Sequence, residues 1–401
     1  MTAAGSGTGP GPLDGYRVVD LTQARAGPVC TRQLADLGAE VVSIGHPGRG
    51  DLVGADRWNL TRNKRSVLLD LARPEGREVF LELCRSCDVL VENFRPAVKH
   101  RLRIGPEDVW KVNERLVYGS ISGFGQTGPY ADRPGVDQIA QGMGGIMSVT
   151  GPPGSGPWRA GIAVSDMAAG TLLTQGVLAA LLERERTGRA QWVHTSVLEA
   201  MLNFMDFQAV RWPNGEGCPG QVGNDHPTVV PMGCFRTGDG YVNLAALSDW
   251  ETFCDAVEAL ELVDDERFAT PGARLENRDA LRQEIEGRMQ QQPTAYWVDR
   301  LVEAGLPAGP VYRLDEVFSD PQIAHLAPTQ MVEGADGRQI TVLGYPVTLT
   351  ETPAAIRRGV PASGADTLEV LADLGLDSEE VHRLIESGVA ATGSTGRGWS
   401  G

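Results

Sequence analysis

The first third of the chain alternates short apolar runs with amphipathic patterns of helical period. Runs of β-branched and aliphatic residues predict strands at residues 16–22, 41–44, 66–71, 88–92 and 116–122. Helices are predicted at residues 28–37 and 74–85, each beginning at a proline. Strands this apolar, joined by helices, indicate a parallel sheet covered on both faces. Ligands bind such sheets beyond the carboxyl ends of the strands, here residues 23–27, 93–94 and 123–130.

The pattern changes in the middle of the chain. Loops rich in Gly and Pro are predicted at residues 142–157 and 214–227, and a long apolar helix runs from 167 to 187. A strand is predicted at 191–196. The following elements are a strand at 240–245, helices at 249–260, 277–291 and 294–303, strands within 339–349 and a helix at 378–387. We expect a large domain at 13–215 and 326–395, a small α+β domain at 225–325, and disordered tails at 1–12 and 390–401.

Composition narrows the classes of function. The net charge of −16 repels nucleic acid and anionic membranes, so we expect neither as a partner. No apolar run is predicted to span a bilayer and no targeting segment is visible, which favours the cytoplasm. The six scattered cysteines, including the CxxC at 84–87, suit reduced packing thiols. No histidine or cysteine spacing indicates a metal site.

Asp166 stands where an extended run meets the long predicted helix. Capping that helix is the ordinary use of an Asp in this position. A carboxylate held ionised at a helix start is also suited to attack a thioester carbonyl. Both interpretations stay open at this point. The small residues at 168–170 leave room for an acyl group to approach.

Two further motifs are ambiguous. The run GFGQTG at 123–128 matches GxGxxG, but prolines follow it and no helix is predicted, so it is not a dinucleotide fingerprint. Basic clusters lie at 62–65 and 95–103. They are either solvated faces with local salt bridges or parts of an anionic nucleotide site beside Asn93 and Phe94.

Several motifs, in order along the chain, resemble the family III CoA-transferases, which include formyl-CoA and carnitine CoA-transferases and α-methylacyl-CoA racemase. The matching runs are 13–22 (LDGYRVVDLT), 26–28 (AGP), 34–40 (LADLGAE), 63–66 (NKRS), 91–94 (VENF), 123–129 (GFGQTGP), 223–227 (GNDHP) and 308–312 (AGPVY). The resemblance implies a Rossmann-like large domain, a smaller domain and an interlocked, ring-like homodimer. It also implies acyl-CoA and a carboxylic acid as substrates, with no prosthetic group.

The resemblance assigns roles to individual residues. Asp166 matches the catalytic carboxylate, which forms a mixed anhydride with the acyl group and then a thioester with CoA. Residues 220–224 match a loop that shields the intermediate from water. The residues expected to contact coenzyme A are His46, Leu69, Ala72, Asn93, Phe94, Arg101, Arg25, Ala26 and Asp137.

Several positions depart from the family pattern. Val136 stands where racemases carry a His, and valine is neither acid nor base, which favours transfer over racemisation. Ser43 and Gly45 stand beside His46 where family members commonly carry a Lys and a Glu, which weakens the binding of CoA expected at this position. Arg25 binds either a carboxylate of a diacid substrate or a phosphate or surface partner. An acyl-CoA racemase or epimerase with another base, and a non-catalytic acyl-CoA-binding paralogue, remain alternatives.

Overall fold

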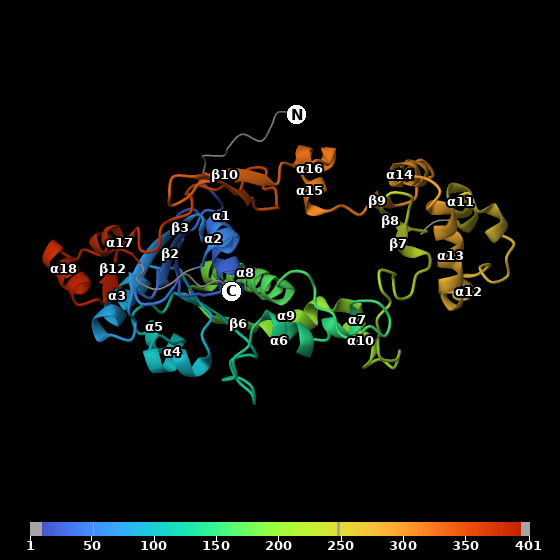
Figure 1. The fold of residues 1–401 in the computed structure, drawn as a ribbon. Coiled ribbons are helices and arrows are strands. Elements are labelled where there is room, and N and C mark those ends of the chain that lie inside the picture. The colour runs from blue at the N-terminus through green and yellow to red at the C-terminus, as the bar shows by residue number, and fades with distance from the viewer. Residues whose placement is uncertain (1–9, 51, 247–248, 394–401) are drawn as a thin grey trace. The chain divides into compact units, whose positions relative to one another are not determined.

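The computed structural model describes residues 10–50, 52–246 and 249–393 and divides into two compact units, each described by itself (Figure 1). The larger unit comprises the described parts of Met1–Ile146, Arg159–Glu216 and Ala327–Gly401. The smaller comprises Met147–Trp158 and the described parts of Gly217–Leu326. The sequence places residues 147–158 in the large domain, but Gly223 N–H donates to the Gly151 carbonyl at 3.0 Å and Gln221 Nε2 to the Thr150 carbonyl at 2.6 Å. These bonds attach the segment to the smaller unit.

A seven-stranded sheet forms the centre of the larger unit, in the order β12-β3-β2-β1-β4-β5-β6. Strands β1 to β6 run parallel, and β12 lies antiparallel beside β3. The order reverses between β1 and β4, where Val18 pairs with both Val41 and Val89. The carboxyl ends of β1 and β4 therefore flank the switch point of the topology, the usual ligand position. The strands are β1 Arg17–Asp20, β2 Glu40–Gly45, β3 Lys64–Leu69, β4 Val89–Glu92, β5 Val117–Ser122, β6 Trp192–Ser196 and β12 Ala390–Ala391.

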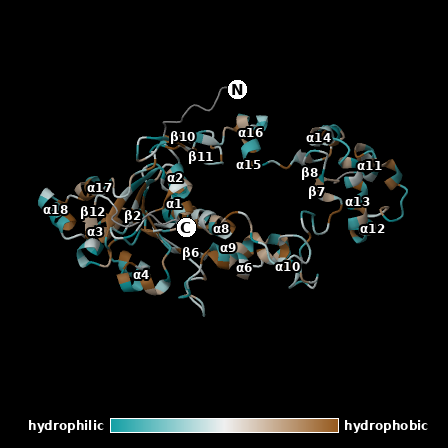
Figure 2. Cartoon of the chain, in the orientation of Figure 1, coloured by the Kyte–Doolittle hydropathy of each residue, from teal (hydrophilic) through white to brown (hydrophobic). Residues whose placement is uncertain are grey.

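Helices cover both faces of this sheet, and hydrophobic residues gather in its strands (Figure 2). On one face α1 and α8 pack together and bury one cluster of aliphatic side chains. On the other face α3, α17 and α18 bury a second cluster. A hairpin of β10 Thr329–Glu333 and β11 Gln339–Leu343 also belongs to this unit. Its helices are α1 Ala26–Asp36, α2 Gly54–Thr61, α3 Pro74–Arg85, α4 Pro96–Leu102, α5 Pro106–Val109, α6 Asp137–Met143, α8 Val164–Thr187, α9 Val197–Phe204, α10 Asp206–Arg211, α17 Thr367–Asp373 and α18 Ser378–Glu386.

Helix α8 is long and apolar enough, by length and composition, to cross a membrane, although the sequence predicts no such run. Half of its most apolar window is buried inside the protein, where it packs against α1, α9 and the sheet. Buried core helices pass the same test, so this one helix is weak evidence for a membrane span.

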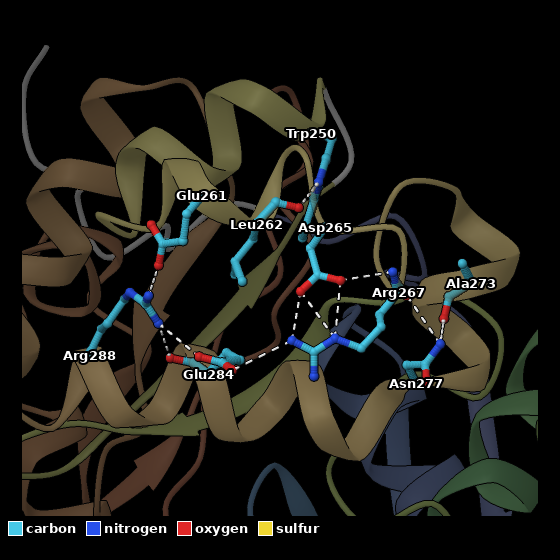
Figure 3. Close-up of polar contacts among 9 residues, drawn as sticks. All are labelled: Trp250, Glu261, Leu262, Asp265, Arg267, Ala273, Asn277, Glu284 and Arg288. Atoms are coloured by element: carbon cyan, nitrogen blue, oxygen red, sulfur yellow. Dashed lines mark hydrogen bonds and ion pairs between the residues drawn. The ribbon is translucent and has the colours of Figure 1, made fainter.

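The smaller unit combines a three-stranded antiparallel sheet with helices around a separate core that contains Phe253 and Trp297. Its surface carries a chain of charge pairs (Figure 3). Arg267 contacts Asp265 at 2.6 Å and Glu284 at 3.9 Å, and Arg288 joins Glu284 to a further glutamate. The elements are β7 Met232–Arg236, β8 Tyr241–Ala245, β9 Ala308–Pro310, α11 Trp250–Ala256, the 3-10 helix Leu260–Leu262, α12 Pro271–Glu276, α13 Arg278–Met289, α14 Thr294–Glu303, α15 Leu314–Val317 and α16 Pro321–Leu326, while α7 Ile146–Val149 spans the boundary between the units.

The α/β class with a mainly parallel sheet, predicted from the apolar runs, is confirmed. The predicted tails differ from the structure where it describes them. Gly11 is buried against the Leu37 carbonyl, and Ala390, 1% exposed, pairs with Leu69 in β12. The small polar composition of these segments hides this packing. The rest of the predicted tails, residues 1–9 and 394–401, lies outside the described residues.

Candidate active site

Asp166 is the third residue of α8, which begins three residues earlier than predicted. The N-cap position is Ala163, and no side chain caps the helix. The capping interpretation of Asp166 is therefore wrong. Burial and then the nearby Asp137 raise the pKa of Asp166 from 3.8 to about 6, while Arg25 acts in the opposite direction. The helix start does not keep the pKa of this carboxyl low, because burial and the nearby Asp137 outweigh the opposing charge of Arg25.

Asp137 anchors the start of α8. It is the first residue of α6, and its Oδ1 accepts hydrogen bonds from the Ser165 N–H at 3.0 Å and from Ser165 Oγ at 2.6 Å. Its Oδ2 accepts from Gln141 Nε2 at 2.7 Å, with Arg159 at 3.6 Å. The predicted CoA contact is thus a buried carboxylate bound to the residue before Asp166. Ser165 was not singled out by the sequence.

Helix α1 lies against α8 one turn beyond Asp166. A Cβ on Gly170 would lie 2.5 Å from the Ala26 carbonyl oxygen and 2.7 Å from the Val29 side chain. Ala168 and Ala169 are buried in the same layer. The small residues at 168–170 therefore permit close packing of two helices, and do not form an open approach for an acyl group. This contact places the beginning of α1 beside Asp166.

Arg25 occupies the N-cap position of α1, directly before the contact with α8. Its guanidinium forms an ion pair with Asp56, in the first turn of α2. Its charge also lowers the pKa of Asp166. Arg25 therefore pairs with a surface carboxylate and also interacts electrostatically with the candidate nucleophile. Asp56 was missed, because no local pattern marks a partner 31 positions away in the chain.

Asn93 clamps the loop that carries Arg25. Its Oδ1 accepts from the Gln23 N–H at 2.9 Å, and its Nδ2 donates to the Gln23 carbonyl at 2.7 Å. Asp20 Oδ1 fixes the start of the same loop by accepting from the Thr22 N–H at 2.9 Å. The two bonds between Asn93 and Gln23 join the carboxyl ends of β1 and β4 across the switch point. The side-chain amide of Asn93 thus forms hydrogen bonds with the protein backbone.

A pocket of about 500 Å³ lies at the carboxyl ends of β1, β2 and β3. His46 belongs to its wall, where its Nδ1 accepts from the Gly48 N–H at 3.0 Å and its Nε2 lies 3.5 Å from Asp70. Ser43 and Gly45, the two departures from the family pattern, are also in the wall. The remaining lining residues are Asp20, Thr22, Gln23, Ala24, Pro28, Ile44, Arg49, Gly50, Leu52, Arg57, Thr61, Lys64, Ser66, Leu68, Pro361 and Ser363.

The sequence profile of CoA-transferase family III matches residues 13–367. The chain belongs to CoA-transferase family III. The acetyl-CoA:oxalate CoA-transferase of Acetobacter aceti is 38% identical and covers 84% of this chain and 90% of that protein. The succinyl-CoA:mesaconate CoA-transferase of Haloarcula hispanica is 37% identical, covering 91% and 97%. The crystal structure of a CAIB/BAIF family protein from Brucella suis matches with a TM-score of 0.82 at 32% identity, covering 91% and 100%.

This family III CoA-transferase does not gather all the residues expected at the CoA site into the pocket. Leu69 is 1% exposed in the core of the sheet, and its neighbour Leu68 lines the pocket instead. Ala26 is buried, at 4% exposure, and is not among the residues that line the pocket. Phe94 is half-buried, and Ala72 and Arg101 are exposed outside the pocket lining.

The basic clusters of the transferase divide into exposed and buried cations: Arg95 and Arg103 are exposed, as Arg101 is, which agrees with a solvated face. Lys64 is buried with Asp20 at 2.9 Å, and Arg62 is fully buried with Asp36 at 2.8 Å. Lys99 is also fully buried, 3.0 Å from a glutamate at the end of β4. These cations neutralise buried carboxylates. Within the described residues, no group of three or more His, Cys, Asp or Glu is placed to hold a metal ion.

Proposed function

We propose that this family III transferase moves CoA from an acyl-CoA to a free carboxylic acid through covalent attack by Asp166. The observation that carries this proposal is the half-buried carboxyl of Asp166, whose pKa burial and Asp137 raise to about 6 against the opposing charge of Arg25. Roughly nine-tenths of such carboxyls are ionised at pH 7. A carboxylate of raised pKa is a more basic nucleophile than an ordinary one.

The proposed chemistry balances without any added reactant. An Asp166 oxygen attacks the thioester carbonyl, the C–S bond breaks, and CoA thiolate leaves behind a mixed anhydride. The thiolate then attacks the Asp166 carbonyl carbon and expels the first acid as its carboxylate. The acceptor carboxylate attacks this aspartyl thioester and releases the thiolate. Finally the thiolate attacks the acceptor acyl carbon, and Asp166 leaves as a carboxylate.

The pocket at the ends of β1, β2 and β3 is the proposed site for the nucleotide part of CoA. Its position beyond the carboxyl ends of parallel strands is typical of nucleotide sites. His46, Arg49 and Arg57 contribute basic side chains to a wall within an acidic protein. The clamp from Asn93 to Gln23 connects this wall to the loop that carries Arg25.

Arg25 is proposed to bind the distal carboxylate of a dicarboxylic acceptor. Its guanidinium influences Asp166 electrostatically, so a ligand beside it lies near the reacting carboxyl. Guanidinium groups bind carboxylates with paired hydrogen bonds. The acceptors named for the two relatives, oxalate and mesaconate, are both dicarboxylic acids.

We also propose that the enzyme acts as a homodimer in the cytoplasm, interlocked as the family resemblance implies. Exposed apolar side chains on α6, α9 and α10 support an interface, because soluble monomers seldom expose such patches. These are Ile139, Met143, Leu202, Phe204 and Val210. Six free thiols support a reducing compartment.

Trapping with hydroxylamine tests the aspartyl intermediate. The enzyme is incubated with succinyl-CoA or acetyl-CoA and hydroxylamine, digested, and analysed by mass spectrometry. Hydroxylamine converts an anhydride or thioester of Asp166 to a hydroxamate, and Asp166→Asn abolishes this adduct. Omission of acyl-CoA provides the control. Adducts at another carboxylate, or none across a broad set of donors, contradict the mechanism.

Deuterium exchange separates transfer from racemisation. A racemase exchanges the α-proton of its acyl-CoA with solvent, whereas transfer leaves that proton in place. Val136, 60% exposed, supplies no base at the position of the racemase histidine. We therefore expect no deuterium at the α-carbon of 2-methylacyl-CoA after incubation in heavy water. Exchange at a rate comparable with CoA transfer would support the racemase.

A further inference from the structure

The ion pair between Arg25 and Asp56 carries an inference about which acids the enzyme accepts. Asp56 is the only hydrogen-bonding partner of the Arg25 guanidinium among the residues that the structure describes. The contact joins one nitrogen, Nη2, to one carboxylate oxygen, Oδ1. A guanidinium has five N–H donors in a fork that matches both oxygens of a carboxylate. The contact with Asp56 therefore occupies only some of the N–H donors of Arg25.

Both members of the pair are partly exposed to solvent. The side chain of Arg25 is 29% exposed and that of Asp56 is 47% exposed. An ion pair in this setting contributes little stability, because water competes for both charges. The pair can therefore open when another carboxylate reaches Arg25.

The backbone around Arg25 is held more firmly than its side chain. Ala26, the next residue, packs against Gly170 of α8, and the preceding loop is clamped by Asn93 through Gln23. Arg25 thus keeps its place beside Asp166 when the partner of its guanidinium changes. The variable part of the arrangement is which carboxylate the guanidinium holds.

We propose that Asp56 is an internal competitor that occupies Arg25 until the distal carboxylate of a dicarboxylic acceptor displaces it. This inference rests on the proposed role of Arg25 in acceptor binding. Monocarboxylic acids have no second carboxylate to displace Asp56. The strength of the Arg25–Asp56 pair therefore sets the preference for diacids over monoacids.

If Asp56 competes with the diacid, removing its charge should strengthen diacid binding; if Asp56 supports diacid binding, removing its charge should weaken it. Exposed ion pairs of this kind weaken a competing ligand roughly two- to fivefold. In Asp56→Asn we expect diacid binding to tighten by that factor relative to monoacid binding. If Asp56 instead orients Arg25 for the substrate, the same change weakens diacid binding.

The experiment measures dissociation constants by calorimetry on the full-length enzyme in the presence of CoA. Diacids from oxalate to glutarate are each compared with a matched monoacid, such as succinate with butyrate, in which a methyl group replaces one carboxylate. The measured quantity is the ratio of the two constants. Asp56→Glu keeps the competing charge and should keep the wild-type ratio. Asp315→Asn is the matched control, since Asp315 is also an ion-paired acid in the first turn of a helix.

A double-mutant cycle completes the test. In an Arg25→Ala background, Asp56→Asn should have no further effect on the ratio, because the competed group is absent. An unchanged or reversed ratio in Asp56→Asn, an equal change for diacids and monoacids, or no preference for any diacid in any variant overturns the proposal. The hydroxylamine adduct at Asp166, followed in each variant, reports separately on the covalent mechanism. Absence of that adduct in the wild-type enzyme contradicts the proposed function, whereas the ratio of dissociation constants can still be measured.

Discussion

The acid limb of the transfer reaction should report the environment of Asp166. Only the ionised carboxyl attacks a thioester, so acylation should follow one ionisation with a midpoint at about pH 6. Roughly a tenth of the plateau rate is expected at pH 5 and roughly nine-tenths at pH 7. Asp137→Asn should move the midpoint to lower pH, and Arg25→Gln should move it to higher pH.

The size of these shifts follows from the causes of the raised pKa. The rise from 3.8 to about 6 corresponds to about 3 kcal/mol held against the ionised form. Burial is the largest cause of the raised pKa and Asp137 is the second. In Asp137→Asn the midpoint should therefore lie between pH 3.8 and about pH 6. Asparagine keeps an Oδ1 that accepts from Ser165, so this variant removes the charge and retains the anchor of α8.

Rapid quenching provides the assay. Enzyme and succinyl-CoA are mixed between about pH 5 and 8 and quenched in acid, and the CoA-bearing protein is counted by intact mass spectrometry. Asp315→Asn removes a charge elsewhere and should keep the wild-type profile. A wild-type midpoint near that of an ordinary Asp, or shifts of the same sign in Asp137→Asn and Arg25→Gln, would refute the electrostatic argument.

Three predictions concern stability and are checked by urea unfolding. Asp166→Asn should raise the free energy of unfolding by up to about 3 kcal/mol at pH 8 and leave it unchanged at pH 3. The reason is that a carboxyl with a raised pKa costs the folded protein stability as the pH rises through the folded value of about 6. Equal effects at both pH values would contradict this. Gly170→Ala should cost roughly 1–3 kcal/mol, whereas Gly287→Ala, where a Cβ meets nothing within 4 Å, should gain roughly 0.5–1 kcal/mol. Lys99→Met should cost about 3–5 kcal/mol by leaving the buried Glu92 unpaired, and adding Glu92→Gln should recover most of it.

The sheet was predictable because its central strands, such as β4 and β5, are buried on both faces and most of its strands contain short apolar runs. The six parallel strands all coincide with predicted runs. Short helices such as α2 and α6 were not predicted, because one or two turns with mixed polarity give no clear period. The edge strand β12 is two residues long and has no pattern of its own.

The candidate site was predictable in its parts and not in its connections. Asn93 was found because it follows a strand, but its bond to Gln23 depends on β4 lying beside β1, which local sequence does not specify. Lys64 was interpreted as a surface or phosphate-binding cation, because lysine is rarely buried without a partner. Its partner, Asp20, becomes adjacent only when the sheet forms.

The pairing of Ala390 with Leu69 affects how the chain folds during synthesis. Residue 69 leaves the ribosome more than three hundred positions before the strand that covers its edge. Until then the outer edge of β3 presents unpaired backbone groups to other nascent chains. The larger unit therefore reaches its complete hydrogen-bonded form only after residue 391 has been synthesised. A protein truncated before residue 390 would expose an unpaired sheet edge that favours aggregation.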